Sequence, residues 1–188
     1  MRDRRATSLE GVTANTPRRL GDHRGWFAEV FKAAELVTAG IDIEFVQDNE
    51  SFSAPVGTVR GLHYQLDPHA QAKLVRVLRG RALDVAVDIR RESPTFGHHV
   101  AVELTADLGN QLLVPAGFAH AFCTLTPDVH LAYKVSDRYA PETERAIRWN
   151  DPAIGIDWPD WGALGVDGPT LSERDQVAPL LADQPDVF

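Results

Sequence analysis

The chain has 188 residues, of which 44% are hydrophobic and 24% charged, values typical of a globular protein with one sizeable core. Its formal net charge of −8 argues against general nucleic-acid binding, and no apolar run is long enough to span a bilayer. The first eleven residues lack the apolar stretch of a secretory signal, and a single cysteine excludes an internal disulfide. We therefore expect one domain over residues 1–188, located in the cytoplasm, with no nucleic-acid or membrane partner.

The chain begins with one short helix candidate and continues with short β-strand candidates. The helix is expected at 31–38 (FKAAELVT), with Gly40 as its stop signal. The expected strands are 58–65, 75–89, 99–104, 111–114, 120–125 and 129–135. Turn-forming residues separate them at a spacing typical of a β-sandwich or barrel. The Pro- and Trp-rich segment after Asp151 is expected to wrap this barrel.

The run 75–89 alternates as a strand with one buried face does. Its apolar odd positions are Val75, Val77, Leu83, Val85, Val87 and Ile89, whereas the even positions 82–88 are small or charged. We therefore expect only the odd positions to be buried. Gly80 and Arg81 interrupt the alternation, which predicts two strands joined by a tight turn or bulge.

Arg60, His63 and Lys73 form the first group of chemically useful residues. A turn near 67–70 would make the flanking strands a hairpin and would set His63 nearly opposite Lys73. A neighbouring cation favours the neutral imidazole that a general base requires. Arg60 has the opposite strand parity and would need a bulge at Gly61 to reach the same pocket. A surface hairpin with scattered polar residues is the competing interpretation.

The spacing of glycines and histidines resembles that of the cupin motifs. The pattern G-x5-P-x-G-x2-H runs from Gly109 to His120 and matches the second motif. The first motif, G-x5-H-x-H, begins at Gly57 and keeps His63, but Gln65 replaces its second imidazole. The usual set of two histidines and a carboxylate is therefore incomplete, and no metal is expected. No GxGxxG or P-loop motif is present, so no nucleotide cofactor is expected.

Tyr133 and Tyr139 share strand parity within the segment YKVSDRY. Taken alone, each is interpreted as a core tyrosine with a satisfied hydroxyl.

Seven fragments taken together resemble the dTDP-4-dehydrorhamnose 3,5-epimerase family. They are FVQDNESFS, GTVRGLHYQ, QAKLVRVLRGRALDVAVDIRRESPTFG, VPAGFAHAF, YKVSDRY, IRWNDPAIGIDWP and LSERD. The resemblance spans most of 22–179 in the order of the family. It implies an all-β cupin jelly roll with a short N-terminal helix and a wrapping C-terminal segment. It also implies a homodimer that epimerises C3 and C5 of a dTDP-4-keto-6-deoxyhexose without any cofactor.

The resemblance also implies residue roles. His63 matches the general base, Asp175 the carboxylate that orients it, and Lys73 the residue that stabilises the enolate. Tyr133 matches the general acid on the opposite face of the sugar, and Tyr139 the residue that stacks on thymine. Further implied substrate contacts are Arg24, Glu29, Gln47, Asp48, Asn49, Arg60, His120, Glu144 and Arg174.

Three positions depart from the pattern of the family. Ala72 and Ala121 replace glycines and Arg174 replaces a lysine, which leaves the exact sugar open. One alternative is a 3-only or 5-only epimerase of an antibiotic or other deoxysugar pathway, because it would use the same residues. Another is a non-catalytic cupin that binds a sugar nucleotide. The expected signature of that alternative is loss of a catalytic residue, and His63, Lys73 and Tyr133 are all present.

Overall fold

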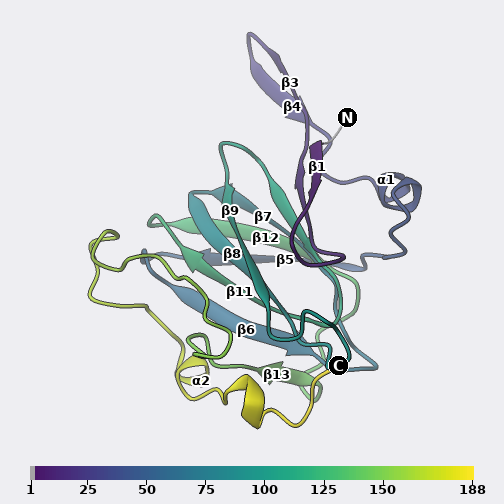
Figure 1. Cartoon of the computed structure of the whole chain (residues 1–188). Coiled ribbons are helices and arrows are strands. Elements are labelled where there is room, and N and C mark those ends of the chain that lie inside the picture. Colours follow the sequence, from purple (N-terminus) through teal and green to yellow (C-terminus); the bar gives the residue numbers. More distant parts are fainter. Residues whose placement is uncertain (1–2) are drawn as a thin grey trace.

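Two antiparallel sheets form a β-barrel in the computed structural model, which describes residues 3–188 (Figure 1). The six-stranded sheet has the order β1 (Asp3–Ala6), β2 (Thr13–Thr16), β10 (Gln111–Val114), β7 (Lys73–Arg79), β12 (Val129–Val135) and β5 (Gln47–Ser53). The five-stranded sheet has the order β13 (Glu144–Ala146), β6 (Val59–Gln65), β11 (Phe118–Thr124), β8 (Arg81–Asp88) and β9 (His99–Thr105). The expected all-β jelly roll is confirmed.

The helical elements are short. α1 (Ala33–Thr38) is the expected N-terminal helix, and Gly40 follows it with a φ of 71°. α2 (Glu173–Gln176) and the 3-10 turn η1 (Leu181–Asp183) belong to the C-terminal segment. None of the helices in residues 3–188 is long and apolar enough to cross a bilayer.

The barrel has an inner core and an outer one. Val75, Leu112 and Leu131 are among the residues buried between the two sheets. The outer core lies where the C-terminal segment covers the five-stranded sheet, with Ile154 and Leu181 packed against that face. The C-terminal segment therefore wraps the barrel, as expected, and stabilises it by removing apolar side chains from water.

The prediction that only one face of the second half of 75–89 is buried was wrong. In β8 the even positions line the barrel interior, where Ala82 and Ala86 are fully buried. The odd positions Val85 and Val87 are buried too, because the C-terminal segment lies over the other face. The tight turn was predicted correctly, since Gly80 joins β7 to β8 with a φ of 80°.

The expected hairpin around residues 67–70 was also wrong. β6 pairs with β11 and β13, whereas β7 pairs with β10 and β12, so the loop between β6 and β7 crosses from one sheet to the other. His63 lies opposite His120 in the strand pairing rather than opposite Lys73. A turn signal between two strands cannot distinguish a hairpin from such a crossover.

The bulge at Gly61 is confirmed. The pairing of β6 with β11 shifts register between His120 and Phe122, and Gly61 has a φ of 128°. A Cβ atom on Gly61 would lie 2.4 Å from the Cβ of Ala121, so only glycine fits there. The bulge brings Arg60 and His63 to the same cavity.

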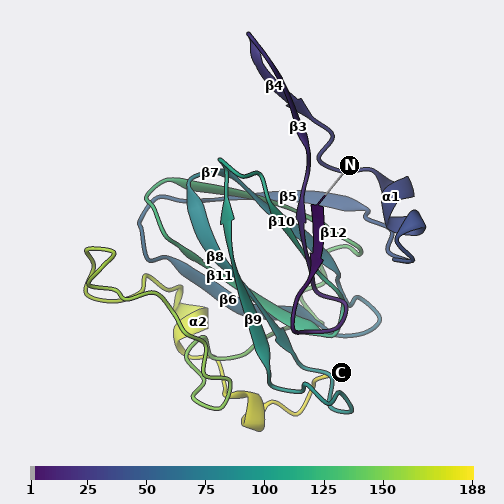
Figure 2. The same ribbon diagram turned by 45° about the horizontal axis from the view of Figure 1, so that its top comes forward.

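A two-stranded hairpin projects from the barrel near the N-terminus (Figures 1 and 2). It consists of β3 (Arg19–Asp22) and β4 (Gly25–Ala28). Trp26 and Phe27 are 58% and 67% exposed on it. These strands were not predicted, because an exposed hairpin lacks the alternation that a buried face imposes.

Candidate active site

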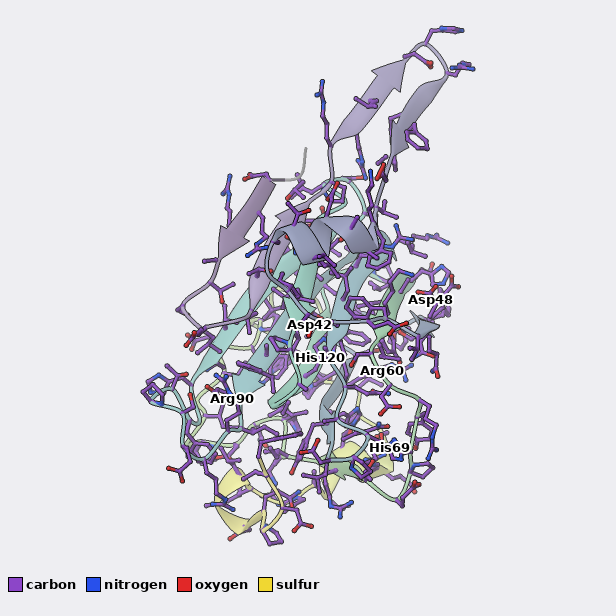
Figure 3. The ribbon with its side chains drawn as sticks, turned by 90° about the vertical axis from the view of Figure 1, so that its right-hand side faces the viewer. Asp42, Asp48, Arg60, His69, Arg90 and His120 are labelled. Carbon is purple, nitrogen blue, oxygen red and sulfur yellow. The ribbon has the colours of Figure 1, made fainter. Side chains whose placement is uncertain are left out.

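A cavity of about 510 Å³ is lined by half of the residues selected from the sequence. Those that line it are Arg60, His63, Lys73, His120, Tyr133, Arg174 and Asp175. A neighbouring cavity of about 430 Å³ shares His63, Lys73 and Tyr133 and adds Gln47, Asn49, Tyr139 and Glu144. Arg60 and His120, both labelled in Figure 3, line the first of these cavities.

His63 is oriented by the buried carboxylate of Asp175. Its Nε2 lies 2.6 Å from Asp175 Oδ1, which α2 presents from the C-terminal segment. Burial opposes ionisation of Asp175, but hydrogen bonds from His63, Ser172 and the Gly61 backbone hold its pKa below the usual value. An ionised carboxylate accepts the Nε2 proton, so the Nδ1 of a neutral ring keeps its lone pair. His63 is therefore suited to accept a proton.

Lys73 provides a cation beside that base. Its Nζ lies 3.4 Å from the backbone oxygen of His63, across the gap between the two sheets. Burial lowers the Lys73 pKa to about 8, against the attraction of Asp84 and Glu144. An ammonium group in a poorly solvated cavity interacts strongly with a developing oxyanion.

Tyr133 reaches the cavity from the six-stranded sheet. It lies on β12, opposite Asn49 of β5 and Val75 of β7. Burial raises the Tyr133 pKa; the Arg60 guanidinium counters this shift and Glu144 adds to it. The phenol therefore keeps its proton near neutral pH and can donate it. The interpretation of Tyr133 as a purely core residue is incomplete, since its side chain is only partly buried and lines the cavity.

His120 has a carboxylate partner that the sequence did not single out. Its Nε2 lies 2.8 Å from Oδ1 of Asp84, a fully buried residue on β8. The other carboxylate oxygen of Asp84 has no hydrogen-bond partner among the described residues. An acidic residue in the interior of an apolar strand, between Leu83 and Val85, was the available signal, but the alternation assigned it to the exposed face.

Tyr139 and Arg174 meet at Glu144 beside the cavity. The Tyr139 hydroxyl donates to Glu144 Oε2 over 2.8 Å, and the Arg174 guanidinium pairs with the same oxygen. Burial raises the Glu144 pKa, but these two hydrogen bonds outweigh it, and the pKa lies below the usual value. Tyr139 is 52% exposed and so is not a core residue.

Three expected contacts lie apart from this cavity. Arg24 sits at the turn of the projecting hairpin and pairs with Asp22. Asp48 faces away from the barrel interior and pairs with Lys134 on the outside over 2.8 Å. Glu29 and Asp48 line a separate cavity of about 470 Å³, which touches the site through Asn49 and Tyr133.

Metal-ligating side chains do not gather anywhere in residues 3–188, where no group of three or more His, Cys, Asp or Glu residues could hold an ion. The side chain of Gln65 instead makes hydrogen bonds to backbone groups.

Comparisons with known proteins all match this chain to epimerases of dTDP-linked sugars. A family model described as dTDP-4-dehydrorhamnose 3,5-epimerase matches residues 6–183. The dTDP-4-dehydrorhamnose 3,5-epimerase of Sinorhizobium fredii is 49% identical over 181 residues, which cover 96% of this chain and 90% of that protein. The dTDP-4-dehydro-6-deoxyglucose 3-epimerase of Streptomyces bikiniensis is 40% identical over 176 residues, covering 93% of this chain and 87% of that protein.

A solved structure extends the likeness to the fold. The dTDP-6-deoxy-D-glucose-3,5-epimerase of Legionella pneumophila, in complex with dTDP-4-keto-L-rhamnose, superposes with a TM-score of 0.91 at 42% identity. The match covers 97% of this chain and 94% of that one.

Proposed function

The chain belongs to the dTDP-4-dehydrorhamnose 3,5-epimerase family, and from this premise we propose that its cavity epimerises C3 and C5 of dTDP-4-keto-6-deoxyglucose, giving dTDP-4-dehydrorhamnose. The observation that carries the proposal is the placement of a proton acceptor and a proton donor on two different sheets around one cavity. His63 comes from the five-stranded sheet and Tyr133 from the six-stranded sheet. Inversion of a carbon centre needs an acid and a base on opposite faces of the sugar.

The first step removes a proton from a carbon beside the C4 ketone. His63 Nδ1 accepts the proton, and the C–H electron pair forms the enolate, whose negative charge rests on O4. The ionised Asp175 stabilises the imidazolium that results. The Lys73 ammonium stabilises the oxyanion, and stabilisation of this kind is usually the largest single contribution to catalysis.

The second step returns a proton to the opposite face. Tyr133 donates its phenolic proton to the carbon as the enolate reverts to the ketone, and the configuration inverts. The proton on His63 then passes to solvent and the Tyr133 phenolate regains one, which resets the site. C3 and C5 both flank the ketone, so the same pair can act on each in turn.

Incubation with dTDP-4-keto-6-deoxyglucose in D₂O tests this function. We expect deuterium at both C3 and C5 with inversion at each, which NMR would resolve by position. Deuterium at C3 alone would instead identify a 3-epimerase, the activity named for the relative from Streptomyces bikiniensis. Absence of incorporation at either carbon would support a non-catalytic sugar-nucleotide-binding protein and would overturn the proposal.

The projecting hairpin supports a homodimer. Leu20, Trp26 and Phe27 are more than half exposed there, an arrangement that favours burial against a second copy of the chain. A second copy could also use Arg24, which lies outside the cavity of its own chain. Sedimentation at micromolar concentration should give a dimer, and a monomer would contradict this assembly. We also propose that residues 1–188 form one domain and that the protein is cytoplasmic.

A further inference from the structure

Gln65 is a buried glutamine whose amide makes hydrogen bonds to the backbone of two loops. The residue is 4% exposed at the end of β6. Its Nε2 donates to the backbone oxygens of His69, over 2.7 Å, and Arg138, over 3.1 Å. Its Oε1 accepts from the backbone N–H of Ala140 over 3.0 Å. One side chain thereby holds the β6–β7 loop against the segment 137–140.

The segment 137–140 lies between β12 and β13 and is held from the β6–β7 loop at further points. Gln71 Nε2 donates to the backbone oxygens of Asp137 and Arg138 over 2.7 and 3.1 Å. The His69 ring, labelled in Figure 3, lies 3.2 Å from Asp137 Oδ2 and 2.9 Å from Arg138 Nη2. The backbone of 137–140 lies outside the sheets, so its position depends on these side-chain bonds.

Tyr139 is the residue of this segment that lines the cavity containing His63 and Lys73. Tyr139 is 52% exposed, and its hydroxyl donates to Glu144. A ring with so little packing of its own takes its position from the backbone that carries it. The backbone N–H next along the chain, that of Ala140, is the one that Gln65 accepts.

We propose that Gln65 is a positioning residue for nucleotide binding, which fixes the segment 137–140 so that Tyr139 can stack on the base of a dTDP-sugar. This inference rests on the proposed function, because it assumes a dTDP ligand. Gln65 also borders the cavity that Tyr139 lines, but its amide is hydrogen-bonded to the backbone of two loops. A residue that acts only through another should lose its effect when that other residue is removed.

Binding of dTDP to the full-length protein, measured by isothermal titration calorimetry, tests the proposal. Gln65→Leu keeps a buried side chain of similar length but cannot make the three hydrogen bonds, and we expect about tenfold weaker binding. Steady-state kinetics should show the same rise in KM, with kcat changed less than about twofold, because His63, Lys73 and Tyr133 keep their positions. The matched control is Gln184→Leu, since Gln184 is also buried but donates to Ala146 O, away from Tyr139; dTDP binding should not change.

A double-mutant cycle with Tyr139→Ala separates positioning from general structural damage. In the Tyr139→Ala background, Gln65→Leu should have no further effect on dTDP affinity. An undiminished effect in that background, or unchanged binding by Gln65→Leu alone, would overturn the inference while leaving the proposed function intact. Failure of the unmodified protein to bind dTDP would overturn both. If Gln65→Leu does not fold, Gln65→Glu provides the same test, because an ionised carboxylate keeps the acceptor for Ala140 but has neither donor.

Discussion

The two sheets that enclose the cavity differ in how they hold their reactive side chains. On the five-stranded sheet, His63 and His120 each have a ring nitrogen within 2.8 Å of a buried carboxylate. On the six-stranded sheet, neither Lys73 nor Tyr133 has a carboxylate partner at hydrogen-bond or ion-pair distance in the part of the chain that the structure describes. The five-stranded sheet therefore presents imidazoles that carboxylates orient. The six-stranded sheet presents an ammonium and a phenol that no carboxylate contacts directly among the described residues.

This difference gives each sheet one half of a proton transfer. A carboxylate behind an imidazole fixes the tautomer and stabilises the protonated ring, which favours proton uptake. Burial raises the pKa of the Tyr133 phenol and lowers that of the Lys73 ammonium. The phenol thereby keeps its proton near neutral pH, and the ammonium keeps its charge below a pH of about 8.

Removal of the base on the five-stranded sheet should have the largest effect on catalysis. His63→Ala should lower deuterium exchange at both C3 and C5 by about 10³-fold, because no other imidazole is bonded to Asp175. Affinity for dTDP, measured by calorimetry, should stay within about twofold. His130→Ala is the control, since His130 lines neither of the two cavities that contain His63. Persistent deuterium incorporation by His63→Ala would remove His63 from its proposed role.

Loss of the Lys73 charge should reduce catalysis next. Lys73→Met should lower kcat/KM by about 10²-fold, since it removes the cation beside the enolate oxygen. In the unmodified enzyme, Lys73 is protonated below its pKa of about 8 and loses its charge above it. A pH profile of kcat/KM should therefore fall as pH rises through about 8. Lys73→Arg should show no such fall, because a guanidinium does not titrate there; an identical profile would assign the titration to another group.

Substitution of Asp84 should reduce catalysis less than loss of the Lys73 charge. Asp84→Asn keeps a hydrogen-bond acceptor for His120 but removes a charge, and we expect about a tenfold loss in kcat/KM. The attraction of Asp84 raises the Lys73 pKa, so its removal should move the falling limb to lower pH. A pH profile that does not move would show that Asp84 acts on His120 alone.

A chelator should have the smallest effect of all. Prolonged dialysis against EDTA should leave the rate unchanged, since the proposed steps use only protein side chains. Loss of turnover that one divalent ion restores would contradict this mechanism.

The fold was predicted where a strand has a clear pattern or clear turn signals. The bounds 111–114 and 129–135 match β10 and β12. β5 (QDNESFS) was not predicted as a strand because most of its side chains are polar on both faces. The alternation in β8 was recognised, but it could not show that one face, with Ala82 and Ala86, lines the barrel interior. Nor could it show that the C-terminal segment covers the other face, which carries Val85 and Val87.

Sequence patterns predicted less of the site than of the fold. His63 and Asp175 are 112 positions apart, and only the resemblance to a family connected them. The bulge that brings Arg60 to the cavity was predicted, because its parity required one. Asp84 and the loop contacts of Gln65 were missed, since a side chain that accepts or donates across loops leaves no periodic signal.

The central claim, that the two sheets separate proton removal from proton return, is tested most directly with Tyr133→Phe. This variant keeps the ring and loses only the phenolic proton. Deuterium content and configuration at C3 and C5 would be followed in parallel by NMR in D₂O. We expect exchange with retention to outpace inversion, because His63 can still form the enolate but can return a proton only to the original face. Inversion at the rate of the unmodified enzyme would contradict the claim and show that another group, or water, is the acid.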